Sequence, residues 1–367
     1  METKRLNIMT SCDDKLSKYI LPQLVSIDRS LSNYDVHFYL VHSRIKPENV
    51  QLLTDFAKNK TKIIFHEIII TEGITFYSSL VENGGGQWPF ETYFTLRLQD
   101  YLPEEVDRIL YIDAGDIIID GDIGPYYFDD FEDNSLIVTP LRYKKDPVSG
   151  ESTLYTKDDI LSVAISSFFN SGSYVINVDK FRAEGYTADD YLYLSNVLAE
   201  NKSPGSLAYF GDQGFLAAAF LEDAKLFGYP QSMDSSYMPY NFVTSYWRDY
   251  RGELEYKKEL DYKPVVLHYA IRTKPWTVRF SEEVIDTVIS EPGFISYRLV
   301  VPIPTIALIT PGHFRMAEIW WEYAKETPIY DEANTRARIT ADNWLEYYLP
   351  MCRDYLQTYY QLHYGSK

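Results

Sequence analysis

Cysteine is scarce in this sequence of 367 residues: there are two, Cys12 and Cys352, far apart in the chain. A single disulfide between them stays open, but a disulfide framework is excluded, and free thiols in a reducing compartment are the expected state. No window approaches about 18 uninterrupted apolar residues, so no transmembrane helix is predicted. The first residues, METKRLNIMTSCDD, lack the apolar core of a signal peptide. We therefore expect a soluble, cytoplasmic protein.

Positive charge is also in deficit, with 35 Lys and Arg against 53 Asp and Glu and a formal net charge of -18. This balance argues against nucleic acid or an anionic membrane surface as the main partner, because either would favour a basic patch. A phosphate-rich small molecule remains compatible, since a metal ion can supply positive charge locally. The 33 tyrosines have two open interpretations: compositional bias, or a surface on which sugar rings stack.

The first 120 residues alternate between strand-like and helix-like segments. Strands are predicted at 5–9, 36–41 and 62–70, and helices at 21–31 and 46–59, from the spacing of their apolar residues. A further helix over 89–102 leads into a strand that ends at Asp113. This alternation predicts an α/β fold with a mostly parallel sheet, in which ligands bind at the carboxyl ends of the strands.

The remaining segments complete this prediction. Residues 81–89 are predicted to be a loop, and they lack the lysine of a phosphate-binding P-loop. Residues 168–178 and 263–270 are strand-like, and 212–221 are helical. Beyond about residue 281 the chain is rich in tryptophan and tyrosine with helical spacing, as in 313–326 and 340–362. We expect a catalytic domain over 1–280 and a helical subdomain over 281–367.

The stretch RILYIDAGDIIIDGDI, residues 108–123, places two acids in an otherwise apolar run. Asp113 and Asp116 can hold a divalent cation or act as an acid/base pair. Taken alone they are weak evidence, because acids are common in turns.

Three later stretches add to this pair. FFNSGSYVINVDKFR is predicted to place Asn170 in a tight turn before a strand. YFGDQGFL places Asp212 and Gln213 at a helix start. LHYAIRTKPW places His268 after a strand, with Lys274 following. In this order, the four motifs resemble retaining glycosyltransferase family 8, which includes bacterial lipopolysaccharide galactosyl- and glucosyltransferases. The resemblance covers about residues 6–278 and implies the GT-A fold.

The resemblance also implies a metal site and a donor. The family's metal is typically manganese, with magnesium as the alternative, and its D-x-D motif is matched by Asp113 and Asp116 with one residue inserted. Gly115 would let the backbone bulge so that both carboxylates converge. His268 matches the histidine that completes the metal site. The expected donor is a UDP-sugar, UDP-glucose or UDP-galactose.

By the same resemblance, Asn170 and Asp212 match residues that hydrogen-bond the donor sugar. Gln213 matches the residue near the β-face of the anomeric carbon, and Lys274 matches a lysine that meets the diphosphate. Each has a simpler alternative, such as a turn residue, a helix cap, a structural histidine for His268 or a surface lysine.

The nucleotide-binding turn of the family is matched by TSCDDK, which makes Asp13 or Asp14 the contact to uracil or ribose, with helix capping as the alternative. The family's donor-binding arginine aligns with Thr95, whereas Arg97 lies about 200° further round a helix and is only a weak candidate. Lys15 and Leu16 replace the family's usual asparagine and tyrosine, which leaves Tyr19 as a candidate for base stacking.

The sequence thus predicts a metal-dependent, retaining hexosyltransferase acting on a hydroxyl of a saccharide, glycolipid or glycoprotein. One alternative is a degenerate sugar-nucleotide or glycan-binding relative that serves as a partner subunit, because Ile271 replaces a family glycine. A hydrolase with Asp113 as nucleophile is less favoured, since position 115 is glycine. The C-terminal helices mix aromatic and acidic residues, which leaves two roles open: packing on the catalytic domain, or contact with an acceptor or a partner. Peripheral attachment to a membrane through the acceptor or partner also stays open.

Overall fold

The computed structural model describes residues 3–84, 89–140, 143–145, 152–154, 169–200, 211–220, 222–227, 239–240, 265–269, 274–289, 311–351, 354, 358 and 361. The chain divides into two compact units, residues 1–241 with 261–268, and residues 242–260 with 269–367. The boundary expected between residues 280 and 281 therefore lies inside the second unit.

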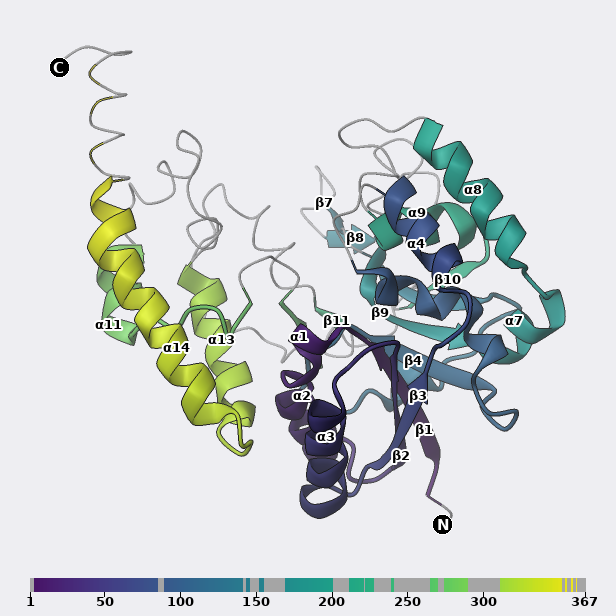
Figure 1. Cartoon of the computed structure of the whole chain (residues 1–367), viewed down its shortest axis with the longest axis horizontal. Helices are drawn as coiled ribbons and strands as arrows, with labels where there is room; N and C mark the ends of the chain where they lie inside the picture. Colours follow the sequence, from purple (N-terminus) through teal and green to yellow (C-terminus); the bar gives the residue numbers. More distant parts are fainter. Residues whose placement is uncertain are drawn as a thin grey trace. The chain divides into compact units, whose positions relative to one another are not determined.

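The first unit is built on a seven-stranded sheet with the order β10-β6-β9-β4-β1-β2-β3 (Figure 1). Its strands are β1 (Arg5–Ser11), β2 (Asp35–His42), β3 (Ile64–Ile69), β4 (Arg108–Ile112), β6 (Leu136–Pro140), β9 (Phe169–Asn177) and β10 (Ala224–Leu226). The pairs β1–β2, β2–β3, β1–β4 and β6–β10 are parallel, while β9 runs antiparallel to β4 and β6. The predicted α/β fold with a mostly parallel sheet is confirmed.

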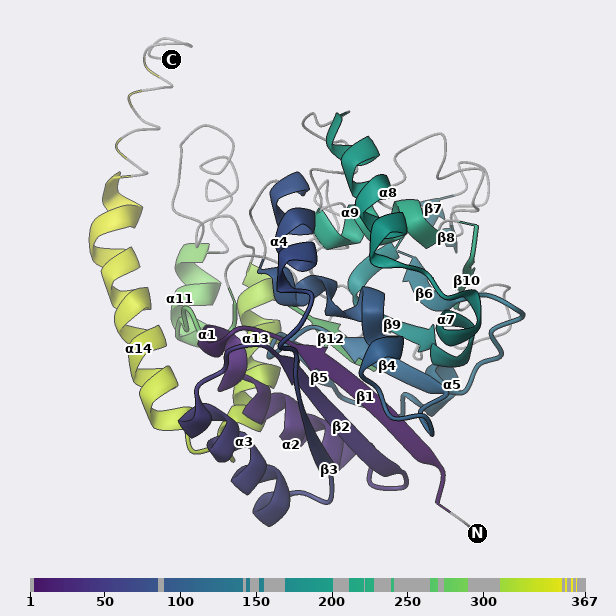
Figure 2. The ribbon, with the colours of Figure 1, turned by 45° about the vertical axis from the view of Figure 1, so that its right-hand side comes forward.

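Helices cover both faces of this sheet. Its central strands are therefore buried along almost their whole length. On one face lie α2 (Ile20–Ser30) and α3 (Pro47–Lys60), whose apolar residues were predicted to form helices (Figure 2). Pro47 occupies the first turn of α3, where a missing N–H costs nothing. The other face buries a core shared by α4 (Ile74–Asn83), η1 (Phe90–Asp100), α7 (Val178–Glu184), α8 (Ala188–Glu200) and α9 (Gly211–Phe220).

The helix predicted over 89–102 is present as a 3₁₀-helix at Phe90–Asp100, with a non-helical break at Arg97 (φ -126°, ψ 28°). The tight turn predicted at Asn170 is wrong. Asn170 and Gly172 lie within β9 and not in a turn before it. The small, polar run Asn170–Ser173 has turn-like composition, but pairing with β4 holds it extended, as Ser173 is opposite Ile112.

A smaller sheet lies beside the end of β4. Its strands are β5 (Ile117–Ile119), β12 (Val266–His268) and β11 (Pro239–Tyr240), in the order β11-β12-β5. Strand β12 is antiparallel to β5, with His268 opposite Ile117. Strand β5 thus begins after a four-residue turn that follows β4. Its pairing with β12 places His268, the last residue of β12, next to that turn. The remaining short elements of this unit are α1 (Asp14–Ser17), α5 (Gly124–Tyr127), β7 (Tyr143–Lys145) and β8 (Ser152–Leu154).

All the elements described in the second unit are helices, as predicted. It contains α11 (Glu282–Val284), the π-helical turn η5 (Ile285–Ile289), α13 (Pro311–Ala324), α14 (Tyr330–Asn343) and the π-helical η7 (Trp344–Tyr348). Trp320 and Trp321 are fully buried in α13, and Trp344 joins a second core with Phe280 and Phe314. Among the described residues, no helix is long and apolar enough to cross a membrane. Cys12 is a buried free thiol, and Cys352 lies outside the described residues.

Arg279 links the helices of this unit. Its guanidinium donates to Glu318 through Nε at 2.8 Å and NH2 at 2.5 Å, and to Asn334 Oδ1 at 2.8 Å. It also lies 4.8 Å from the centre of the Trp321 ring. Buried, bidentate pairs of this kind are costly to break from one side, because the remaining carboxylate loses its partner.

We expect Arg279→Ala to lower the free energy of unfolding by roughly 2 kcal/mol, because charge-assisted hydrogen bonds and a ring contact are lost. Arg315→Ala is the matched control, since Arg315 pairs with Asp286 at an exposed position and should cost about 1 kcal/mol or less. Urea unfolding followed by tryptophan fluorescence measures both. Equal losses in the two variants would contradict a structural role for the Arg279 pair.

Candidate metal and donor site

The site is centred on the turn between β4 and β5, residues 113–116. Asp113 directly follows β4, and its backbone N–H donates to the carbonyl of Gly172 at 2.9 Å, which extends the pairing with β9 by one residue. The Asp113 side chain is one-third exposed, whereas Asp116 is almost buried. The two acids therefore differ in environment although they share one turn.

Gly115 permits this turn for two reasons. Its φ of +78° lies in the left-handed region that side chains disfavour. A Cβ at this position would lie 2.8 Å from Tyr19 Cβ and 3.1 Å from Tyr19 backbone atoms. Tyr19 is itself buried, with 6% exposure, and packs behind the turn. Its ring is therefore poorly placed for the base stacking considered from the sequence.

Gln23, from the buried face of α2, closes the turn. Its Nε2 donates to the Asp113 carbonyl at 2.9 Å, and its Oε1 accepts the Gly115 N–H at 3.3 Å. The side chain is fully buried, so both bonds are sheltered from water. Sequence reasoning missed this residue. The available signal was a glutamine among the buried apolar residues of a helix, a position that requires hydrogen-bond partners.

His268 completes a cluster of three potential ligands. Its Nε2 lies 3.4 Å from Asp113 Oδ2 and 3.9 Å from Asp116 Oδ1, and one ligand atom from each residue falls within 4.8 Å of the others. Antiparallel pairing of β12 with β5 sets this position. The three residues predicted as metal ligands are thus brought together by two different sheets.

The donor set fits a divalent cation. Neighbouring ligands of an octahedral ion bound at about 2.1 Å are ~3 Å apart and opposite ligands ~4 Å apart, and His268 Nε2 lies 3.4 and 3.9 Å from the two carboxylates. Two carboxylates and an imidazole suit manganese, because carboxylates favour magnesium and manganese while imidazole is a softer ligand than magnesium prefers. A dication would also balance the two acidic charges.

Asp212 forms a second acidic position beside Asp113. It lies in the first turn of α9, and its carboxylate accepts hydrogen bonds from the Ser171 hydroxyl and the Gln213 backbone N–H. Burial, and next the negative charge of Asp113, raise the pKa of Asp212 to about 7. The predicted donor-sugar contact therefore does lie near the predicted metal ligands. Ser171 was not identified from the sequence.

Two buried tyrosines support these acids. The Tyr111 hydroxyl donates to Asp113 Oδ1 at 3.2 Å, and the Tyr174 hydroxyl donates to Thr95 Oγ1 at 2.9 Å. Burial is the main cause that raises the pKa of both tyrosines, and the charges of Asp113 and Asp212 add to it. Thr95 is thus connected, through Tyr174, to the part of the core next to these acids.

Asp13 and Asp14 both have structural partners. Asp13 caps α1 by accepting the N–H groups of Lys15 and Leu16 at 3.0 and 3.2 Å. Asp14 accepts the Lys46 N–H at 2.9 Å and the Asn49 amide at 2.7 Å, and the first of these is the main cause that lowers its pKa. Both follow β1, which is parallel to β4, so they lie at the same edge of the sheet as Asp113.

Arg97 and Lys274 each have a partner of their own, and two other residues considered from the sequence are not described fully. Arg97 pairs with Asp100 at 2.5 Å and lines a different pocket. Lys274 belongs to the second unit, where its Nζ donates to the Tyr269 carbonyl at 3.0 Å. The side chain of Asn170, and all of Ile271, lie outside the described residues.

The fold is of the GT-A glycosyltransferase type, and Asp113, Asp116 and His268 form its candidate metal cluster. The chain belongs to glycosyl transferase family 8, whose model matches residues 7–279. The enzyme class predicted from the sequence is therefore confirmed.

Curated relatives are similar at low identity. A lipopolysaccharide 1,2-glucosyltransferase of Escherichia coli is 23% identical over 278 residues, which cover 75% of this chain and 74% of that protein. A lipopolysaccharide 1,3-galactosyltransferase of Salmonella typhimurium is 24% identical over 192 residues, which cover 52% of this chain and 50% of the relative.

Solved structures share the fold. The glycosyltransferase GlyE of Streptococcus pneumoniae superposes with a TM-score of 0.53 at 18% identity, covering 88% of this chain and 60% of that one. The galactosyltransferase LgtC, in complex with donor and acceptor sugar analogues, has a TM-score of 0.50 at 18% identity, covering 74% and 89%.

We expect Gly115→Ala to cost about 2–3 kcal/mol of stability and to weaken Mn²⁺ binding, because a side chain at positive φ would also push against Tyr19. Gly185→Ala is the matched control: Gly185 has φ +63° but open space around its Cβ, so only about 1 kcal/mol is expected. Thermal unfolding with and without Mn²⁺ measures both effects. Equal stability losses and an unchanged Mn²⁺ response would refute the steric role of Gly115.

We expect Gln23→Ala to weaken Mn²⁺ binding by roughly 10–100-fold, because residues that orient metal ligands typically contribute that much. Ser26→Ala controls for damage to α2, since Ser26 is also fully buried but bonds to Ile119 of β5 and to Gln23's carbonyl. Electron paramagnetic resonance of free Mn²⁺ gives the affinity. Parallel weakening in both variants would show that Gln23 acts through the helix and not through the turn.

Proposed function

We propose that this chain transfers a hexose, glucose or galactose, from a UDP-sugar to a hydroxyl of a saccharide, glycolipid or glycoprotein, with retention of the anomeric configuration. The observation that carries the proposal is the convergence of Asp113, Asp116 and His268 at the carboxyl end of β4. In open α/β sheets this edge is where ligands bind. The similarity to a lipopolysaccharide glucosyltransferase and a lipopolysaccharide galactosyltransferase supports glucose or galactose and a saccharide acceptor.

Asp113, Asp116 and His268 are assigned to hold manganese, with magnesium as the alternative. When bound, the ion would neutralise the negative charge that develops on the diphosphate as it leaves. His268 would hold the ion through a ring nitrogen, and the two acids would hold it through carboxylate oxygens. Tyr111 keeps the Asp113 carboxylate in position through its hydroxyl.

Asp212 and Asn170 are assigned to the hydroxyls of the donor sugar. Asp212 is held by Ser171 and by the first turn of α9, so its carboxylate is preorganised to accept hydrogen bonds. Gln213 is assigned to the β-face of the anomeric carbon. Because an amide is a poor nucleophile, its role is to support the positive charge that develops on the sugar ring.

Retention then follows from substitution on one face. The bond between the anomeric carbon and the β-phosphate oxygen breaks, and the acceptor hydroxyl oxygen bonds to that carbon from the same side. The acceptor proton passes to the departing phosphate oxygen, so no protein base is required. Positioning and electrostatic stabilisation carry the catalysis in this scheme.

Nucleotide contacts are assigned to the edge at β1 and η1. Asp13 or Asp14 meets uracil or ribose through the oxygen atoms left after capping, and Thr95 lies on the wall beside the donor. Lys274 is assigned to the diphosphate as a point charge. Arg97 is assigned a structural role, because Asp100 already pairs with it.

The proposal also includes a cellular location for the reaction and a role for the second unit. Catalysis is placed in the cytoplasm, where UDP-sugars are the donors. The aromatic and acidic C-terminal helices are assigned to packing or to contact with the acceptor or a protein partner, through which the chain would reach a membrane surface.

Calorimetry of UDP titrated into the protein tests the metal–diphosphate site. We expect binding in the presence of Mn²⁺ that disappears with chelator, because Asp113 and Asp116 would otherwise repel the diphosphate. Binding that is indifferent to metal would favour the degenerate binding relative. Absence of binding in both conditions would overturn the sugar-nucleotide proposal.

We expect His268→Ala and Asp116→Asn each to weaken Mn²⁺-dependent UDP binding by at least ~100-fold, because each removes a direct ligand. His66→Ala is the matched control, since His66 is a half-buried histidine on β3, away from the cluster. Hydrolysis of UDP-glucose and UDP-galactose, followed by proton NMR of the released sugar, then identifies the donor. Near-normal binding in His268→Ala would remove that residue from the site.

A further inference from the structure

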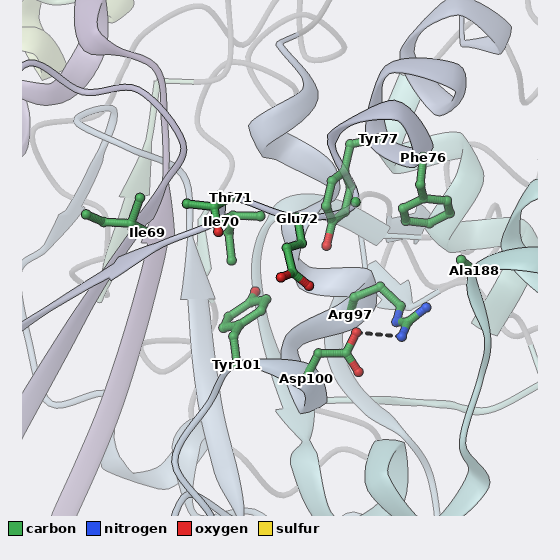
Figure 3. A pocket seen from close by; sticks show the side chains of 11 residues that line it. Ile69, Ile70, Thr71, Glu72, Phe76, Tyr77, Arg97, Asp100, Tyr101 and Ala188 are labelled. Atoms are coloured by element: carbon green, nitrogen blue, oxygen red, sulfur yellow. Dashed lines mark ion pairs between the residues drawn. The ribbon is translucent and has the colours of Figure 1, made fainter.

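A separate pocket of about 390 Å³ opens beside the far edge of the sheet in the first unit. It is formed by the end of β3 and the turn that follows it, the first turn of α4, the last turn of η1, and Ala188 at the start of α8 (Figure 3). None of Asp113, Asp116, Asp212 and His268 lines it. Its volume falls within the range of small-molecule sites.

Aromatic rings form part of its wall. Tyr77 is buried and packs edge-on against Phe76, with ring centres 4.9 Å apart. Tyr101 donates its hydroxyl to the Phe94 carbonyl at 2.8 Å, which fixes its ring. These side chains offer rigid apolar surface next to polar groups, and they lose little entropy when a ligand binds.

Charged groups face the same space. Arg97 and Asp100 form their 2.5 Å ion pair there, and the Glu72 carboxylate points toward the centre of the pocket in Figure 3. The pair presents guanidinium donors beside carboxylate acceptors. Two acids against one arginine leave the pocket with a net charge of about -1, which disfavours a phosphate or another anion.

We propose that this pocket binds a neutral saccharide unit. A sugar ring combines an apolar face of C–H groups with hydroxyls that both donate and accept hydrogen bonds, and the pocket presents partners for each of these. The inference goes beyond the proposed function, because it concerns a second site and does not depend on the donor. The segment η1 joins the two sites, with Thr95 at the acids and Arg97 in the pocket.

Saturation-transfer difference NMR tests the proposal with three probes: methyl β-D-glucopyranoside, methyl β-D-galactopyranoside and lactose. Spectra are recorded on the full chain with excess UDP and Mn²⁺, so that the donor site is filled. We expect saturation transfer to at least one probe, and a loss of roughly five- to tenfold in its apparent affinity in Phe76→Ala and in Glu72→Ala.

Glu82→Ala is the matched control, because Glu82 is an exposed acid on α4, the helix that carries Phe76, and lies outside the pocket. Circular dichroism verifies that all variants are folded. Absence of transfer to every probe overturns the proposal, as does transfer that UDP and Mn²⁺ abolish or that Phe76→Ala and Glu72→Ala leave unchanged. Since the readout does not require catalysis, failure here is distinct from failure of UDP binding.

Discussion

The hydrogen-bonded turn at residues 113–116 is the constraint on which the candidate active site depends. A buried strand must end, place two carboxylates on one side and start a second strand in another sheet within four residues. Gly115 supplies the backbone conformation, and Tyr19 leaves no room for any larger residue. Gln23 then ties both ends of the turn to α2 through a single amide. Because β5 starts at the end of this turn, the same contacts also set where His268 lies.

Electrostatics gives this arrangement its function. Asp113, Asp116 and Asp212 gather negative charge at one edge of the sheet, and burial, followed by the charge of Asp113, raises the pKa of Asp212. A divalent ion would relieve the repulsion and at the same time attract a diphosphate. Binding of metal and donor is therefore expected to be coupled, which fits a family of enzymes that act on nucleotide sugars.

Much of this was predictable from local patterns. Apolar runs located β1 to β4, and the acidic pair and His268, predicted as metal ligands, are brought together by the structure as a cluster of potential ligands. Other features depend on tertiary contacts. Gln23 acts only because α2 packs against the turn, and Asn170 lies in β9 because that strand pairs with both β4 and β6. The helix α14 starts before the aromatic stretch that predicted it. Its sequence is largely polar and it buries only Ala333, Ala337 and Ala341, so the apolar pattern did not reveal its start. The break at Arg97 likewise follows from packing and not from any helix-breaking residue.

The most direct test of the central claim is anomalous diffraction at the manganese edge from crystals grown with Mn²⁺ and UDP. The account predicts a single strong peak within bonding distance of the Asp113 and Asp116 carboxylates and His268 Nε2, with the UDP diphosphate completing the coordination. A peak held by other residues, or UDP bound at this edge with no manganese between it and the two acids, would contradict it.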